Sequence, residues 1–127
     1  MDPAEFLEGG AVGVSDETYA VCRTDGDHPD AFATVREANG TTVVIEQGRM
    51  DAVEADAVEP GWKRLTFEME LPFELVGFLA AVATALAEAD VSVFALSSYA
   101  TDHVLVKRDD LAAAVRKLEG LGCEVAD

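Results

Sequence analysis

The second half of the sequence predicts an α+β fold in the order strand, helix, strand, strand, helix, strand. Between residues 65 and 71, apolar and polar residues alternate, which is the period of a strand with one face in a core. Residues 75–89 and 111–118 instead repeat apolar residues at helical spacing. These three patterns place two helices among short strands.

Four residues mark the ends of these elements. Pro72 ends the first strand, because proline cannot continue a ladder but can open a helix. Asp109 is expected to cap the second helix, since its carboxylate can accept from the free amides of the next turn. Gly120 and Gly122 are the stop signals of that helix.

Further strands complete the pattern. Residues 91–99 are rich in β-forming side chains and predict a strand buried on both faces. Residues 103–107 predict a second strand, and residues 123–125 the last one. Two helices against one face of an antiparallel sheet, in this order, form the ferredoxin-like arrangement. The residues expected to share its core are Leu65, Phe67, Leu79, Val82, Leu86, Phe94, Leu105, Val115 and Leu118.

The first half of the chain has weaker patterns. Residues 32–37 and 41–47 flank Ala38-Asn39-Gly40, and Asn-Gly accepts the positive φ angles that hairpin turns require. Residues 18–23 predict another strand, and residues 49–57 a short helix.

The two halves favour a division into related modules. The strands and helix of the first half are a reduced version of the material in the second, which indicates a degenerate repeat packed edge to edge with it. Pro60-Gly61 punctuates the join. We therefore expect a degenerate module at residues 1–60 and a complete module at residues 61–127.

Acidic residues dominate the charge. The chain has 25 Asp and Glu against 9 Lys and Arg, a formal net charge of −16. Such a surface repels nucleic acid and anionic membranes, so neither is expected as a partner. Two interpretations stay open: a partner with a basic surface, or adaptation to a salt-saturated cytosol. The acids are spread along the whole chain, which favours the second, halophilic interpretation.

Motifs for export, metal binding and catalysis are not found in the sequence. No apolar run reaches the ~18 residues of a membrane span, and the acidic N-terminus lacks the features of a signal peptide, so a cytoplasmic protein is expected. Cys22 and Cys123 are expected to be buried and reduced, and neither shares metal-ligand spacing with His28 or His103. Without a nucleophile motif or a phosphate loop, we expect no enzyme and no cofactor.

Two segments of the second half carry a resemblance to a known family. Residues 72–79 (PFELVGFL) and 91–107 (VSVFALSSYATDHVLVK) resemble the small prokaryotic proteins built from two ACT modules in tandem. These are similar to the modules of the cytosolic arginine sensor of animals. The resemblance covers residues 62–125, and residues 19–23 resemble the first strand of the family's N-terminal module. It implies amino-acid-binding regulatory modules that pair their sheets, often across a dimer.

The loop at residues 71–77 is the first candidate site. The amides of the first helical turn carry partial positive charge and suit a carboxylate, and Gly77 allows close approach of its backbone. In the alternative interpretation Gly77 only lets the helix pack tightly. The family usually has small hydroxyl residues where Glu74 and Val76 stand, and Glu74 would repel a carboxylate but suit an ammonium or guanidinium.

The hairpin at residues 97–102 is the second candidate site. Its hydroxyls, phenol and carboxylate are close enough in sequence to hold the polar end of a ligand. Alternatively, these side chains satisfy local backbone groups. The family commonly has an acid where Ala100 stands and an aromatic where His103 stands.

The function predicted from these features is a regulatory module, without catalysis, that binds a small molecule, and the expected small molecule is an amino acid. A homodimer is expected. The alternative is an interaction or structural homodimer that has lost its ligand. The predicted ligand-binding residues are Phe73, Glu74, Val76, Gly77, Ser98, Tyr99, Thr101 and Asp102.

The net charge of −16 generates a prediction about salt. Because unscreened repulsion grows in dilute buffer, the unfolding midpoint should be clearly higher in 2 M than in 0.1 M KCl. Thermal unfolding followed by circular dichroism measures both midpoints. Equal midpoints would contradict the halophilic interpretation.

Overall fold

The computed structural model describes residues 1–126 and divides into two compact units. The first unit combines Met1–Asp16 with the chain from Lys63 onward, and the second is Glu17–Trp62. The second unit is therefore inserted into the first. One long strand, β5 (Ala55–Phe67), contributes its beginning to the second unit and its end to the first.

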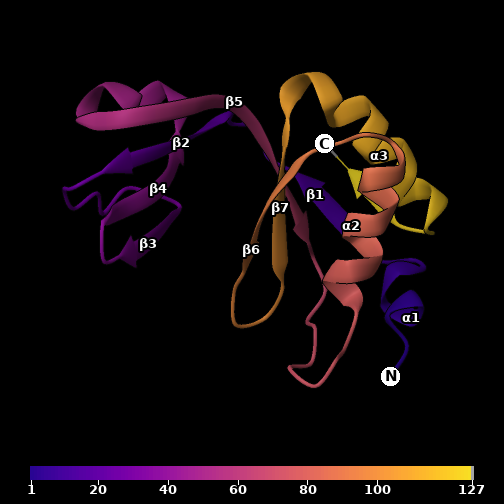
Figure 1. Ribbon diagram of the computed structural model, residues 1–127. Coiled ribbons are helices and arrows are strands. Elements are labelled where there is room, and N and C mark those ends of the chain that lie inside the picture. The colour runs from indigo at the N-terminus through magenta and orange to yellow at the C-terminus, as the bar shows by residue number, and fades with distance from the viewer. Residues whose placement is uncertain (127) are drawn as a thin grey trace. The chain divides into compact units, whose positions relative to one another are not determined.

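The first unit is a sheet covered on one face by helices (Figure 1). Its strand order is β6-β7-β5-β1-β8, with β6 and β7 antiparallel, β1 and β5 antiparallel, and β1 and β8 parallel. Its elements besides β5 are α1 (Pro3–Leu7), β1 (Ala11–Val14), α2 (Phe78–Glu88), β6 (Val93–Ser97), β7 (Asp102–Lys107), the 3-10 turn η2 (Arg108–Asp110), α3 (Leu111–Gly120) and β8 (Glu124–Ala126).

The predicted ferredoxin-like α+β fold is confirmed. The chain from β5 to β8 runs strand, helix, strand, strand, helix, strand, as the sequence patterns indicate. The structure adds β1, which pairs with β5 on one side and β8 on the other. Val12 of β1 is fully buried opposite Phe67, so the first sixteen residues contribute to the core of this unit.

The core of the first unit lies between the sheet and the helices. It contains most of the predicted core residues: Leu65, Phe67, Val82, Leu86 and Leu118 are buried in it, and Leu79 packs against it. Three predicted members do not belong to this cluster. Val104 and Val106 of β7 face this cluster. Because side chains alternate along a strand, the fully buried Leu105 between them points to the other face of the sheet, and so does Phe94, which pairs with Leu105. Val115 is half-buried on α3.

Several predicted boundaries are wrong for identifiable local reasons. Helix α2 begins at Phe78 rather than at residue 75, because Gly77 adopts a left-handed conformation with φ +90° at the N-cap. Asp109 lies within the 3-10 turn η2, and the N-cap of α3 is Asp110, whose side chain makes no capping hydrogen bond. Strand β6 is half-exposed along its length, not buried on both faces.

The second unit is a smaller antiparallel sheet in the order β3-β4-β2-β5. Its core consists of Ala20, Cys22, Val43 and Ile45. Its elements are β2 (Tyr19–Thr24), β3 (Ala33–Glu37), β4 (Gly40–Glu46), the 3-10 helix η1 (Gln47–Ala52) and the beginning of β5.

Two predictions for this unit have opposite outcomes. The hairpin is confirmed, because β3 and β4 pair up to Glu37 and Gly40 around the Ala38-Asn39 turn. The short helix predicted at residues 49–57 is wrong in its extent. A 3-10 helix occupies only Gln47–Ala52, and the chain from Ala55 is extended because it pairs with β2.

Both cysteines, Cys22 and Cys123, are buried and free. Burial raises the pKa of each thiol, so the reactive thiolate is disfavoured at neutral pH. Within the described residues, no helix has the length and apolar character needed to cross a membrane.

Leu86→Ala tests the assignment of the core. Leu86 is fully buried between α2 and the sheet, and truncation of such a side chain should lower the free energy of unfolding by about 2–5 kcal/mol. Val76→Ala is the control, because 82% of Val76 is exposed and its loss should change stability by about 0.5 kcal/mol or less. Urea unfolding of the two variants measures the difference, and equal effects would contradict the packing described.

Candidate functional site

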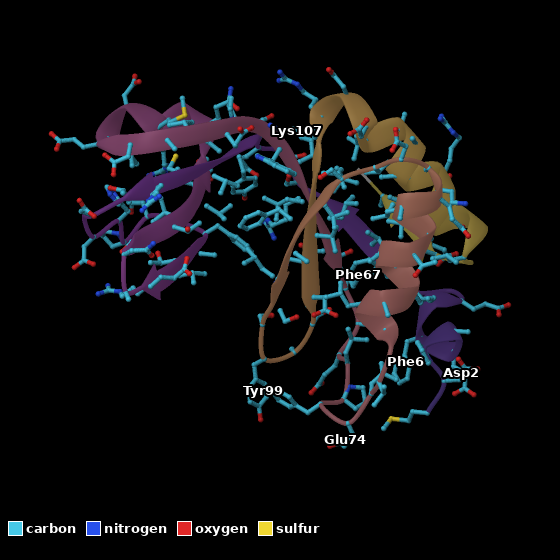
Figure 2. All side chains as sticks on the ribbon, viewed as in Figure 1. Asp2, Phe6, Phe67, Glu74, Tyr99 and Lys107 are labelled. Atoms are coloured by element: carbon cyan, nitrogen blue, oxygen red, sulfur yellow. The ribbon has the colours of Figure 1, made fainter. Side chains whose placement is uncertain are left out.

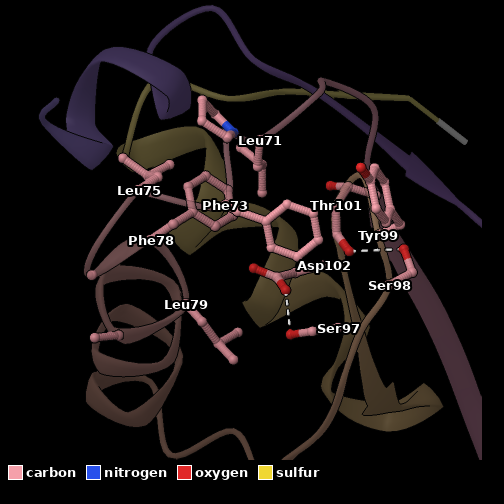
Figure 3. A pocket seen from close by; sticks show the side chains of 13 residues that line it. Leu71, Phe73, Leu75, Phe78, Leu79, Ser97, Ser98, Tyr99, Thr101 and Asp102 are labelled. Atoms are coloured by element: carbon pink, nitrogen blue, oxygen red, sulfur yellow. Dashed lines mark hydrogen bonds between the residues drawn. The ribbon is translucent and has the colours of Figure 1, made fainter.

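A hollow of about 340 Å³ opens in the first unit between the start of α2 and the β6–β7 hairpin (Figure 3). One side is the loop that follows β5 together with the first turn of α2, and the other is the end of the hairpin. The residues that line it are Leu71, Pro72, Phe73, Leu75, Gly77, Phe78, Leu79, Ala80, Ser97, Ser98, Tyr99, Thr101 and Asp102.

The loop before α2 is shaped by proline and glycine. After β5 ends, Leu75 N–H donates to the Pro72 carbonyl at 3.0 Å and closes a turn. Gly77 then takes φ +90°, a conformation that side chains rarely adopt, and Ala81 N–H donates to its carbonyl at 2.9 Å. Because glycine has no side chain to cap the helix, the first-turn amides of α2 stay available beside the hollow.

The hairpin end is held by its own hydroxyl groups. Ser98 donates from both its backbone N–H and its Oγ to the Thr101 carbonyl, each at 2.9 Å. Ser97 Oγ donates to Asp102 Oδ1 at 2.5 Å, across the last pair of the β6–β7 ladder. Ser98 thus satisfies local backbone, as one interpretation of the sequence expects, whereas Asp102 is bonded through one oxygen only by a neighbouring hydroxyl.

Two hydrogen bonds tie the hairpin end to the rest of the site. Thr101 Oγ1 donates to the Phe67 carbonyl at 2.6 Å, and Leu71 N–H donates to the Ala100 carbonyl at 2.8 Å. They connect the hairpin to the end of β5 and to the loop that follows it. The two sides of the hollow are therefore fixed to one strand.

An aromatic pair stands at the outer edge of the hollow. The rings of Phe73 and Tyr99 meet edge to face, with centroids 4.8 Å apart and planes at 81°. Both side chains are largely exposed, 71% and 82% respectively. Figure 2 shows Tyr99 at the tip of the hairpin and Glu74 at the tip of the facing loop. The pair bridges the two sides where the hollow opens to solvent.

The structure brings most of the predicted site residues together. Phe73, Gly77, Ser98, Tyr99, Thr101 and Asp102 all line the hollow. Glu74 and Val76 are exposed and do not line it.

The sequence analysis missed the apolar wall of the hollow. That wall consists of Leu71, Leu75, Phe78 and Leu79. The helical stripe of apolar residues does include three of them, but the sequence pattern assigns such a stripe to the core. Leu71 and Leu75 belong to the loop named as the first candidate site, and Phe78 and Leu79 form the helical turn that follows it, so their place beside this loop was the available signal.

His103 follows Asp102 along β7, so the side chains of the two residues point to opposite faces of the sheet. Its Nδ1 is 3.1 Å from Thr66 Oγ1, and its Nε2 is 3.4 Å from Ser98 Oγ. Burial lowers the pKa of His103, and the Arg64 guanidinium lowers it further, while Asp102 opposes both effects. The neutral imidazole is therefore the favoured form.

Metal-binding geometry is not found in the part of the chain that the structure describes. Across residues 1–126, no three His, Cys, Asp or Glu side chains converge on a point where they could hold an ion. The chemistry available in the hollow is that of hydroxyls, one carboxylate, backbone amides and apolar side chains.

The model of the ACT domain family matches residues 57–120. The chain belongs to this family. The matched segment runs from within β5 to the end of α3 and includes every residue that lines the hollow. ACT domains are regulatory, ligand-binding modules. No curated protein matches the sequence.

Solved structures share the fold over nearly the whole chain. A protein from Agrobacterium tumefaciens has a TM-score of 0.80 at 20% identity, with 93% of this chain and 92% of that chain covered. A protein of unknown function from Vibrio cholerae, described as a possible transport protein, has a TM-score of 0.73 at 27% identity, with 94% of each chain covered. The regulatory subunit of aspartate kinase from Thermus thermophilus, in its ligand-free form, has a TM-score of 0.65 at 9% identity, with 91% and 98% covered.

The lowered pKa of His103 generates a prediction about pH. The unfolded chain takes up a proton near the ordinary pKa of about 6.5, before the folded one does, so protonation favours unfolding. The stabilising contribution of a neutral His103 is complete above pH 6.5 and falls as the pH drops below it. His103→Gln removes this titration. The stability difference between wild type and H103Q, measured by urea unfolding, should shrink from pH 7.5 to pH 5.5, and a constant difference would contradict this account.

Proposed function

We propose that the chain is a regulatory module without catalysis that binds a small molecule of the amino-acid class in the hollow beside α2. The observation that carries the proposal is the convergence of six predicted ligand-binding residues on that one hollow. Membership of the ACT domain family supports it, because the matched segment contains the whole lining. The volume of about 340 Å³ lies within the range of small-molecule sites.

An amino acid has groups that match this lining. Its carboxylate would meet the first-turn amides of α2, where the helix dipole is positive. Its ammonium would meet Asp102, and an apolar side chain would lie on the wall that includes Leu75 and Leu79. Glu74, which would repel a carboxylate at this helix start, is exposed and outside the lining.

The organisation proposed for the whole chain is a tandem of modules at residues 1–60 and 61–127, similar to that of the arginine sensor. The first module is the degenerate one. The resemblance of residues 19–23 and 62–125 to the two modules of tandem ACT proteins supports this organisation. Strand β6 pairs only with β7 among the described strands, and an open edge of this kind favours a homodimer. We propose that this dimer works in the cytoplasm of a halophilic cell, where molar salt screens the net charge of −16 on each chain.

A second candidate function is an interaction module that has lost its ligand. The exposed Phe73 and Tyr99 rings favour it, because these two large side chains are 71% and 82% exposed and contact each other, and Val76 on the same loop is 82% exposed. In this case the hollow is a remnant, and the exposed side chains contact a second copy of the chain.

A thermal-shift screen in 2 M KCl against the twenty amino acids and common nucleotides tests the proposed function. A ligand at a hundred times its dissociation constant should stabilise the fold by about 2.7 kcal/mol, which raises the unfolding midpoint by several degrees. Shifts should be confined to amino acids. If no compound gives a shift, the interaction function is favoured, and the oligomeric state of Tyr99→Ser then tests that alternative.

Calorimetric titration of variants with an amino acid found in the screen places the site. Gly77→Val should weaken binding, because a branched side chain at φ +90° distorts the start of α2 beside the hollow. Gly9→Val is the matched control, since Gly9 also has a positive φ, +73°, but lies outside the lining. Ser98→Ala should remove a polar contact at little cost to the fold. Unchanged affinity in both Gly77→Val and Ser98→Ala would show that the ligand binds elsewhere.

A further inference from the structure

The lining of the hollow beside α2 carries a negative charge and no positive charge. Among its lining residues, all of which lie in the described part of the chain, Asp102 is the one carboxylate, and none is basic. Outside the lining, Glu74 on the exposed loop adds negative charge at the opening. With a net charge of −16 on the chain, the potential at this site is negative. An anion would enter against this potential and find no side-chain cation.

We propose that the ammonium group is the part of the ligand that the hollow selects, and that Asp102 is the specificity-determining residue. The ligand class is a primary ammonium attached to an apolar body of about the size of a leucine or phenylalanine side chain. This inference rests on the proposed function, and it adds that the ligand's carboxylate contributes little to affinity.

Asp102 is positioned to bind a cation. The Ser97 hydroxyl donates to Oδ1 at 2.5 Å, which fixes the carboxylate and leaves Oδ2 for an incoming donor. The residue is half-buried at the base of the hairpin end, where a charge-assisted hydrogen bond is stronger than on an open surface. His103, its neighbour along β7, is on the other face of the sheet and favours its neutral form, so it does not supply the missing positive charge.

The remaining walls suit the body of an organic amine. Leu71, Leu75, Phe78 and Leu79 form one apolar side. The Phe73 and Tyr99 rings stand at the opening, and Figure 3 shows Phe73 pointing from its loop toward the hairpin. Aromatic faces attract ammonium groups, and they also cover the apolar part of a ligand. A ligand bound through its ammonium would therefore be enclosed on both its charged and its apolar parts.

The inference is tested with analogues that lack either the carboxylate or the ammonium group of an amino acid. Calorimetric titration in 2 M KCl compares phenylalanine with 2-phenylethylamine, which lacks the carboxylate, and with 3-phenylpropanoate, which lacks the ammonium. Leucine, 3-methylbutylamine and 4-methylpentanoate form a parallel series. In the series that binds, the amine should keep an affinity within about tenfold of the amino acid, and the deaminated acid should lose about a hundredfold or more.

Asp102→Asn provides the matching change in the protein. Asparagine keeps an oxygen to accept from Ser97, so the hairpin is preserved while the charge is removed. The amine should bind about ten- to a hundredfold more weakly to D102N. Glu74→Gln is the control, because it removes an exposed charge outside the lining, which 2 M salt largely screens. Its affinity for the amine should match that of the wild type.

The outcomes separate the inference from the proposed function. If the amino acid and the deaminated acid bind while the amine does not, the proposed function stands and the ammonium-selective site is overturned. Equal affinity of wild type and D102N for the amine also overturns it. If no compound of either series or of the amino-acid screen binds, the proposed function fails, and this inference fails with it.

Discussion

Phe67 connects the two sides of the hollow to the core. Its ring is fully buried and meets the Phe78 ring edge to face, with centroids 5.1 Å apart, which holds the first turn of α2 against the sheet. Its carbonyl accepts from Thr101 Oγ1 at 2.6 Å, which holds the end of the β6–β7 hairpin. One residue at the end of β5 therefore sets the distance between the loop and the hairpin. Any change that moves Phe67 changes both walls of the site together.

The chemistry of the candidate site follows from where α2 begins and where the β6–β7 ladder ends. Gly77 delays the start of α2, and the loop that precedes it contributes Leu71, Phe73 and Leu75 to the hollow instead of to a longer helix. On the other side, the ladder ends at the pair of Ser97 and Asp102, so polar groups gather where β-pairing ends. The hollow combines apolar surface with a carboxylate because the start of α2 and the end of the β6–β7 ladder both line it.

The sequence contains enough local information to predict most elements and six of the thirteen residues that line the hollow. Helical spacing and β-forming runs locate α2, β7 and α3 to within a few residues, and Asn39 locates the β3–β4 hairpin, whereas the strand predicted at residues 65–71 captures only the end of β5. The strands that the sequence patterns did not predict depend on pairing with distant parts of the chain. β1 pairs with strands more than fifty residues away, and no local pattern in the sequence indicates this partner. The extended conformation after Val53 likewise depends on pairing with β2.

The insertion of Glu17–Trp62 into the first unit has a consequence for the order of folding. Just beyond the β1–β5 ladder, Ser15 and Arg64 are linked by two hydrogen bonds although they are 49 positions apart. Ser15 N–H donates to the Arg64 carbonyl at 2.9 Å, and Arg64 N–H donates to Ser15 Oγ at 3.0 Å. Closing so long a loop from an unfolded chain is entropically costly. If the inserted unit folds first through its own hairpins, it brings β1 and β5 close to each other and shortens the loop that remains to be closed. The rate at which the first unit forms then depends on the inserted unit, even though the hollow contains none of the inserted unit's residues.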